Sequence, residues 1–193
     1  MLFAIAGSQG TGKSTLIQNL SQYYKTIERK TSRSILADWN VSLSEVNNNH
    51  ELTIKFQDEI LLRKQQDEAV AVASSEVFCT ERTYADLFVY ALVALGKDNQ
   101  YSDYLNEYYH RCVEAQKAYQ RVFYLTAGHF APVEDGVRGT NQHYSRMVDL
   151  AMADYTKSMT EESKVFFIHE SDLKTRTEYV AGSAALFEYN ASK

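Results

Sequence analysis

Proline and cysteine are scarce in this sequence of 193 residues. The one proline, Pro132, argues against long disordered linkers, which are usually rich in this residue. The two cysteines, Cys79 and Cys112, stand far apart in the sequence and form no CxxC pair. This pattern argues against a structural zinc site and indicates a reducing compartment, so we expect a cytoplasmic protein.

The chain also lacks long apolar runs and long basic runs. No apolar stretch approaches the ~20 residues that a membrane-spanning helix needs, and the apolar start is too short for a signal peptide. We therefore expect no membrane association. The formal net charge is −5, which argues against nucleic acid as the main partner. The length suits one domain over residues 1–193.

Short apolar runs alternate with segments of helical spacing along the chain. The runs predict five strands, at 2–6, 26–28, 77–80, 122–125 and 165–169. The helical spacing predicts helices at 14–24, 32–39, 51–73, 84–95, 101–119, 144–159 and 173–186. The polar, Asn-rich stretch 41–50 predicts a loop. Strands that alternate with helices predict an α/β fold of three layers, with a mainly parallel sheet between helices.

A complete phosphate-binding motif follows the first predicted strand. Residues 7–14 read GSQGTGKS, which matches GxxxxGK[ST], and an amphipathic helix comes next. Glycines let successive backbone N–H groups point at phosphate oxygens, and the helix N-terminus adds its positive dipole end. The residues expected to bind the triphosphate of ATP are Gly7, Gln9, Gly10, Thr11, Gly12, Lys13, Ser14 and Thr15.

Within this motif, two side chains carry specific chemistry. Lys13 would reach the β- and γ-phosphates and act in catalysis, and Ser14 would offer its hydroxyl to Mg²⁺. The motif predicts a nucleotide but no particular reaction. The sequence contains no NKxD loop of switch GTPases and no LSGGQ signature of ABC ATPases.

The third predicted strand ends in an acid followed by an arginine, Glu81-Arg82. A strand-end acid beside a phosphate loop is well placed to bind Mg²⁺ or its waters, so Glu81 is a candidate metal ligand. This step resembles the DR or ERS element of nucleoside and nucleotide kinases. The resemblance implies that the acid lies near Mg²⁺ or the acceptor, and that Arg82 contacts a phosphate during catalysis.

Three further stretches resemble the NadR-like branch of P-loop kinases and the phage-type deoxynucleotide kinases. They are the Glu28-to-Arg33 stretch after the second strand, the 78–86 stretch, and a basic lid at 133–138. The resemblance covers most of residues 1–170. It implies a P-loop NTPase fold of the nucleoside monophosphate kinase type, with a lid at about 127–146.

Glu28 and Arg33 are candidates for the acceptor side of the site. Glu28 ends a predicted strand at the edge where open α/β sheets bind ligands, and would orient an acceptor hydroxyl as general base. Arg33 would clamp an acceptor phosphate, because the guanidinium fork matches phosphate oxygens. We expect Asp86 on a helix surface or beside Arg82.

The segment Ala127–Thr140 holds three of the eight glycines and predicts a mobile loop. Arg138 in this loop would close on the transferring phosphoryl group, and Arg146 in the next helix is a second candidate. Tyrosines also recur at helical spacing and are expected in the core or on a homodimer face, at 101, 104, 108, 109 and 119.

These features predict ATP-dependent phosphoryl transfer to a nucleoside or a (deoxy)nucleoside monophosphate, with ATP and Mg²⁺ as cofactors. Two arginines on the acceptor side favour a monophosphate. Two alternatives stay open at this point. One is a regulatory NTPase that switches a partner, and the other is a kinase that acts on nucleic-acid ends, against which the negative charge counts.

Overall fold

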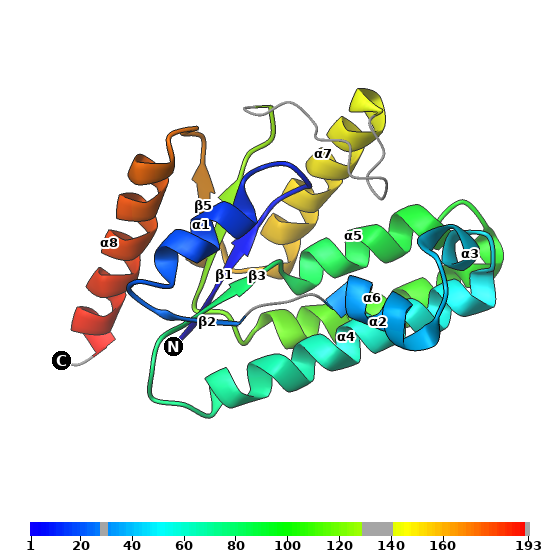
Figure 1. The fold of residues 1–193 in the computed structure, drawn as a ribbon, viewed down its shortest axis with the longest axis horizontal. Helices are drawn as coiled ribbons and strands as arrows, with labels where there is room; N and C mark the ends of the chain where they lie inside the picture. Colours follow the sequence, from blue (N-terminus) through cyan, green and yellow to red (C-terminus); the bar gives the residue numbers. More distant parts are fainter. Residues whose placement is uncertain (28–30, 129–140, 192–193) are drawn as a thin grey trace.

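Five parallel strands form the centre of the computed structural model, which describes residues 1–27, 31–128 and 141–191 (Figure 1). They are β1 (Leu2–Ala6), β2 (Lys25–Ile27), β3 (Phe78–Glu81), β4 (Arg121–Leu125) and β5 (Val165–Ile168). Their order across the sheet is β2-β3-β1-β4-β5, and each neighbouring pair is parallel. The predicted strands are confirmed, with their ends shifted by at most one residue.

Helices cover both faces of the sheet (Figure 1). One face carries α1 (Lys13–Leu20) and α8 (Leu173–Ala191). The other carries α4 (His50–Val72), α5 (Tyr84–Leu95), α6 (Ser102–Gln116) and α7 (Gln142–Met159). The helix α2 (Thr31–Trp39) packs on α4, and short 3₁₀ turns lie at Asn99–Tyr101 and Glu162–Lys164. The predicted three-layer α/β fold is confirmed. Within the part of the chain described, no helix is long and apolar enough to cross a membrane.

The central strand β1 supplies side chains to two separate cores. Leu2, Ala4 and Ala6 join the cluster under α4, α5, α6 and α7, whereas Phe3 and Ile5 join the cluster under α1 and α8. Successive side chains of a strand point to opposite faces, so a strand covered on both sides reads as a continuous apolar run. This is why the first six residues predict a strand so clearly.

The loop predicted over residues 41–50 is wrong, because the structure has a short helix, α3 (Leu43–Asn47), in this segment. The Ser42 hydroxyl accepts a hydrogen bond from the Glu45 N–H at 3.2 Å, and the Glu45 carboxylate accepts one from the Ser42 N–H at 2.7 Å. This reciprocal capping box satisfies N–H groups that the first turn leaves open. Val46 is buried and anchors the helix to the core.

The predicted tyrosines belong largely to the core. Tyr108 and Tyr119 are fully buried, while the other three are partly buried and pack against the same cluster. The hydroxyl of Tyr108 donates to the Gln57 carbonyl at 3.1 Å, which satisfies the polar tip of a buried ring. The expectation of a core role is confirmed, and a homodimer face stays a prediction.

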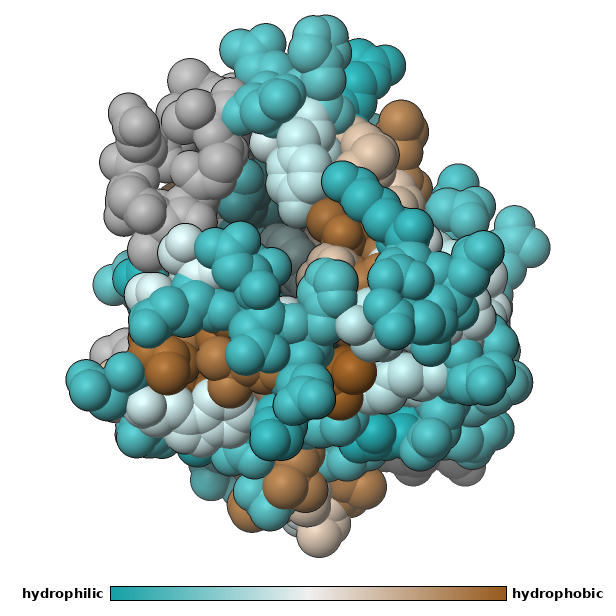
Figure 2. Space-filling model, turned by 90° about the vertical axis from the view of Figure 1, so that its right-hand side faces the viewer, coloured by the Kyte–Doolittle hydropathy of each residue, from teal (hydrophilic) through white to brown (hydrophobic). Residues whose placement is uncertain are grey.

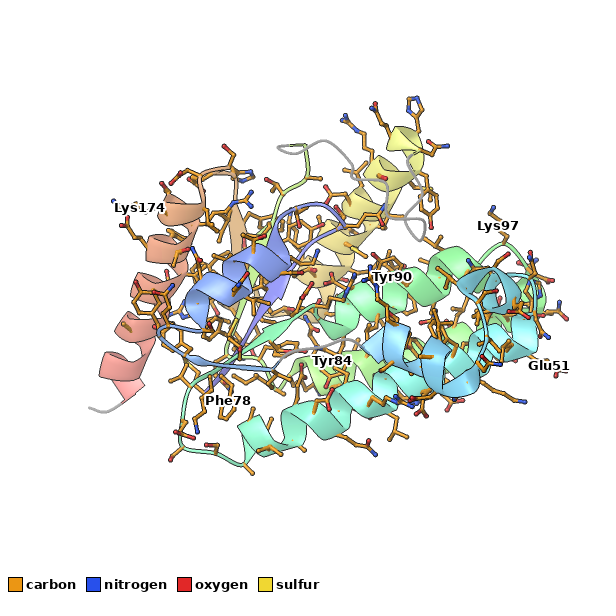
Figure 3. The ribbon with its side chains drawn as sticks, in the orientation of Figure 1. Glu51, Phe78, Tyr84, Tyr90, Lys97 and Lys174 are labelled. Atoms are coloured by element: carbon orange, nitrogen blue, oxygen red, sulfur yellow. The ribbon has the colours of Figure 1, made fainter. Side chains whose placement is uncertain are left out.

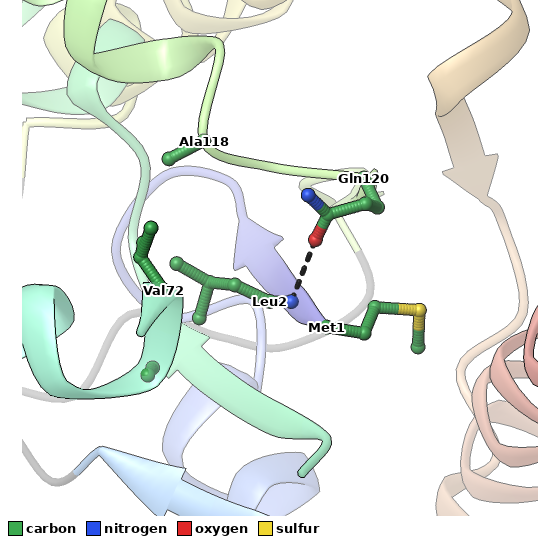
Figure 4. A pocket seen from close by; sticks show the side chains of 6 residues that line it. Met1, Leu2, Val72, Ala118 and Gln120 are labelled. Carbon is green, nitrogen blue, oxygen red and sulfur yellow. Dashed lines mark hydrogen bonds between the residues drawn. The ribbon is translucent and has the colours of Figure 1, made fainter. Parts of the chain in front are cut away.

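The carboxyl ends of the strands all lie at one edge of the sheet, because the strands are parallel. A small pocket of about 80 Å³ lies at the opposite edge, between the start of β1 and the end of α4 (Figure 4). There the Leu2 N–H donates to the Gln120 side-chain oxygen at 2.7 Å. Ligands of open α/β sheets bind beyond the carboxyl ends, so the candidate site lies at the other edge.

Candidate active site

The phosphate loop leaves β1 at its carboxyl end and leads into α1, as the motif predicts. Gly7 has φ 129°, and a Cβ there would lie 2.5 Å from the Leu125 carbonyl oxygen, so the loop crosses close to the end of β4. Gly12 is the N-cap of α1 with φ 88° and has no side chain to cap the helix. The first N–H groups of α1 therefore face an edge where a phosphate would satisfy them.

Lys13 is folded back over this loop. Its Nζ donates to the Ser8 carbonyl at 2.5 Å and lies 3.4 Å from the Thr11 hydroxyl. Only 5% of Lys13 is exposed, so the ammonium group sits inside the loop rather than in solvent. Phosphate oxygens placed in the loop would compete with the Ser8 carbonyl for this cation.

The two predicted metal ligands come together in the structure. The Ser14 hydroxyl lies 3.2 Å from both carboxylate oxygens of Glu81, although the residues are 67 positions apart. Ser14 is an exposed residue in the first turn of α1. Glu81 is the last residue of β3, which pairs with β1. These contacts bring the Ser14 hydroxyl and the Glu81 carboxylate together beyond the carboxyl ends of the strands.

This donor set fits Mg²⁺. The ion prefers oxygen ligands and is commonly held by one or two carboxylates together with substrate phosphates and waters. Ser14 and Glu81 supply a hydroxyl and one carboxylate. Among the residues that the structure describes, no group of three or more His, Cys, Asp and Glu side chains forms a self-sufficient metal site. A hydroxyl and one carboxylate suit an ion that also takes phosphate oxygens and waters as ligands.

Arg82 follows Glu81 in a left-handed backbone conformation, with φ 66°. Its N–H donates to the Ile5 carbonyl at 2.9 Å, which ties the turn to β1. Its guanidinium donates to the Tyr90 hydroxyl at 3.2 Å and lies 5.2 Å from the centre of that ring. Tyr90 and then Asp86 raise the pKa of Arg82 above its ordinary value, so the group stays charged at any physiological pH.

Of the two places expected for Asp86, the helix surface is wrong, because the side chain is completely buried. The place beside Arg82 fits the structure, since the charges of the two residues act on each other. It is the third residue of α5 and forms a capping box with Thr83, with both hydrogen bonds at 3.2 Å. Burial raises the pKa of Asp86, while the charges of Lys13 and Arg82 oppose that rise. The T-x-x-D spacing after the strand was the sequence signal for this cap.

Figure 3 shows how α5 presents two labelled tyrosines to different neighbours. Tyr84, in the first turn, lies on the side toward α4, where its hydroxyl donates to Glu68 at 2.8 Å. Tyr90 lies on the side toward α7 and carries the Arg82 contact. Figure 2 shows the molecular surface hollowed below the part of the molecule where α7 begins. The helix thus supports the strand end with one face and the candidate site with another.

Two residues that the sequence analysis missed brace the phosphate loop. Asp149 of α7 accepts hydrogen bonds from the Ser8 hydroxyl at 2.8 Å and the Tyr124 hydroxyl at 2.9 Å. Arg176 of α8 donates to the Thr11 carbonyl at 2.6 Å. No local pattern signals either contact, since the partners lie 141 and 165 positions apart.

The other predicted site residues differ in exposure, and two of them lie outside the described residues. Glu28 and Arg138 lie outside the described residues, as does most of the predicted lid. Arg33 is exposed on the first turn of α2, and Arg146 is exposed on α7. In the loop and first turn, Gln9 is half-buried and Gly10 and Thr15 are exposed. Positions 142–146, predicted as part of the lid, belong to α7.

Comparison with known proteins gives a family and several structures of the same fold. A family model described as an AAA domain matches residues 2–173. The structure of deoxyadenosine kinase from M. mycoides with bound dATP is similar, with a TM-score of 0.72 and 17% identity over 96% of this chain and 100% of that chain. The structure of the same enzyme with dCMP and dCDP bound has a TM-score of 0.72 and 16% identity, over 96% of this chain and 99% of that chain.

A NadR protein in complex with NR is also similar, with a TM-score of 0.70 and 16% identity. The match covers all of this chain but 52% of the NadR chain. No curated protein sequence matches the chain. The predicted resemblance to P-loop nucleoside and nucleotide kinases is thus confirmed as a likeness of fold.

Proposed function

The chain belongs to the AAA domain family, and we propose that it transfers the γ-phosphoryl group of ATP to a nucleoside or a (deoxy)nucleoside monophosphate. The observation that carries the proposal is the strand-end pair Glu81-Arg82 beside the phosphate loop. The backbone turn after β3 places the Glu81 carboxylate next to the Ser14 hydroxyl and the Arg82 guanidinium next to the Tyr90 hydroxyl. A guanidinium held next to the carboxylate suits an anionic reactant, such as the phosphate of an acceptor or the transferred phosphoryl group.

The similar structures support the same class of reaction. Both M. mycoides structures are of a deoxyadenosine kinase, with dATP in one and dCMP and dCDP in the other. The NadR structure holds NR. Each of these ligands is a nucleoside or a nucleotide, so a small-molecule acceptor of that kind is the substrate class that we propose for this chain.

On the donor side, the loop N–H groups and the α1 N-terminus would bind the phosphates of ATP. Lys13 would exchange its hydrogen bond with the Ser8 carbonyl for the β- and γ-phosphate oxygens. Ser14 and Glu81 would hold Mg²⁺, which when bound neutralises negative charge on those oxygens. In such transfers the protein contributes chiefly positioning and electrostatic stabilisation.

On the acceptor side, Arg82 would contact a phosphate oxygen of the acceptor or of the transferred group, held in place by Tyr90. Glu28 would orient the attacking hydroxyl, and Arg33 would bind the acceptor phosphate. Arg138 and Arg146 would approach from the lid side. A dry and charged site of this kind would keep water from competing with the acceptor.

A panel experiment tests the proposal. ATP consumption is measured with each common nucleoside and deoxynucleoside and each of their monophosphates, and the phosphorylated product is identified by mass spectrometry. We expect turnover to rise at least tenfold with the right acceptor, and Lys13→Ala to remove that rise. If no acceptor gives a product while a protein or a nucleic-acid end stimulates ATP consumption, the proposed function is wrong.

A further inference from the structure

A charged pair lies buried on the underside of the site. Lys64 and Glu68 are one helical turn apart on α4, their exposed fractions are 0% and 2%, and their charged groups are 2.5 Å apart. The spacing of charges along α4 suggests a polar outer face, yet these two point inward against β3 and α5. A charge hidden from water is costly unless it is paired and hydrogen-bonded.

Glu68 is held by a complete set of donors. Besides Lys64, its carboxylate accepts hydrogen bonds from the hydroxyls of Thr80 at 2.8 Å and Tyr84 at 2.8 Å. The Tyr119 hydroxyl lies 3.1 Å from both oxygens. The two tyrosine rings stack with centroids 5.6 Å apart, and Glu68 is the point where their hydroxyls meet. The carboxylate therefore has no freedom to turn, and it fixes the position of the lysine.

Lys64 connects Glu68 to the backbone at the end of β3. Its Nζ donates to the Arg82 carbonyl at 3.0 Å and lies 3.4 Å from the Glu81 carbonyl. These are the backbone oxygens of the two residues whose side chains face the candidate site. Arg82 also has the φ of 66° that a residue with a Cβ adopts only when its surroundings require it.

Stability alone does not explain a buried ion pair. Replacing such a pair by well-packed apolar residues is often neutral or stabilising, because the desolvation penalty disappears with the charges. An apolar pair could occupy the space between α4 and β3, although the hydroxyls of Thr80, Tyr84 and Tyr119 would lose their shared acceptor. It would not donate to the backbone carbonyls of Glu81 and Arg82, a contact that requires a hydrogen-bond donor at the position of the Lys64 ammonium group.

From this geometry, and on the basis of the function proposed above, we infer that Lys64 and Glu68 form a positioning pair for phosphoryl transfer. Lys64 holds the Glu81-Arg82 turn in its left-handed conformation, which directs the carboxylate to Ser14 and the guanidinium to Tyr90. Neither residue of the pair touches a substrate. Their role is to set where the metal ligand and the acceptor-side cation lie.

The test uses the full chain with Lys64→Met and with the double variant Lys64→Met/Glu68→Leu. The single variant leaves Glu68 buried without its cation and can fail to fold, whereas the double variant removes both charges. Arg111→Met is the matched control, because Arg111 forms an ion pair at 2.7 Å with Asp58, also on α4, but on its partly exposed side. Thermal unfolding is measured first for each protein.

The readout independent of activity is ATP affinity, measured by calorimetry with Mg²⁺ and again in EDTA. We expect the double variant to bind metal-free ATP like the wild type. Its gain of affinity on adding Mg²⁺ should fall about tenfold, the scale typical of removing a group that supports a metal ligand. With the acceptor found in the panel, kcat should fall ~10–100-fold while the KM for ATP stays within about twofold. The control should match the wild type.

The inference would be overturned if the double variant folds and shows the same gain of ATP affinity on adding Mg²⁺, and the same kcat, as the wild type. It would also be overturned if neither variant folds, because the pair would then be purely structural. An equal loss in Arg111→Met would also count against it, because a general weakening of α4 would then be the cause. If the wild type phosphorylates no acceptor, the proposed function fails, and the Mg²⁺ titration still decides the role of the pair.

Discussion

Replacing Arg176 with methionine should loosen the phosphate loop from the side of α8. Arg176 is 2% exposed, and its guanidinium donates to the Thr11 carbonyl at 2.6 Å and to the Glu170 carbonyl at 2.5 Å. Methionine keeps much of the apolar stem and removes both hydrogen bonds. Burial lowers the pKa of Arg176, although its ordinary value is so high that the group remains charged.

The size of the effect follows from these contacts. A hydrogen bond from a charged donor contributes about 1.5–3 kcal/mol, and the loss leaves two carbonyls poorly satisfied. The desolvation of the guanidinium opposes this, so we expect a net loss of about 3 kcal/mol in the free energy of unfolding. For a chain of this size that corresponds to a fall of roughly 6–12 °C in Tm.

The loop contact adds a functional consequence to the loss of stability. Because Thr11 belongs to the phosphate loop, we expect ATP to bind about tenfold more weakly, which reduces the Tm increase that saturating ATP produces. The assay is thermal unfolding with and without ATP, together with calorimetric titration. Lys174→Met on the same helix is the control. Lys174 points away from the body of the molecule (Figure 3), and its side chain is 83% exposed and lies 3.8 Å from Glu178.

Two results would refute this reasoning. If Arg176→Met unfolds within 0.5 °C of the wild type, as Lys174→Met should, the buried contacts do not stabilise the fold by about the amount that charged hydrogen bonds usually give. If the variant is less stable but binds ATP with unchanged affinity, Arg176 supports α8 and has no role in holding the phosphate loop.

Three other variants test the site directly. Lys13→Ala should abolish phosphoryl transfer and weaken ATP binding while the fold stays intact; transfer at the wild-type rate would contradict the assignment of the loop. Glu81→Gln should lower the Mg²⁺-dependent part of ATP affinity about tenfold by calorimetry, with metal-free affinity as the internal control. Arg138→Ala should reduce single-turnover phosphoryl transfer by ~10²-fold, with little change in ATP affinity, as expected for a cation that acts in the transition state. A loss confined to ATP affinity would make Arg138 a donor-binding residue, and unchanged turnover would leave Arg146 as the next candidate.

The features predicted from the sequence are those that depend on neighbouring residues. The phosphate loop is recognisable because Gly7 and Gly12 occupy backbone conformations with positive φ, and the helix after it starts at Lys13. The strands are recognisable because burial on both faces gives continuous apolar runs. The Glu81-Arg82 step was identified because it directly follows such a run, and its pairing with Ser14 follows from β1 and β3 being neighbours.

The features that were missed depend on contacts between distant segments. Lys64 and Glu68 look like part of a solvated helix face, because the tyrosines and the strand end that surround them come from elsewhere in the chain. The burial of Asp86 was missed for the same reason, although its interaction with Arg82 was one of the two alternatives expected. The helix α3 was missed because the asparagines of this stretch indicated a loop. Ser42 and Glu45 have the spacing of a capping box, which was the signal for the helix.

The braces on the phosphate loop also limit what the motif can do away from this protein. Ser8 is held by Asp149 from one helical layer, and Thr11 is held by Arg176 from the other. A transplant of residues 7–14 into another scaffold would carry every letter of the motif without either brace. A shortened version of this protein that ended before α8 would likewise keep the motif and lose half of its support. The conformation of this loop therefore belongs to the assembled layers as much as to its eight residues.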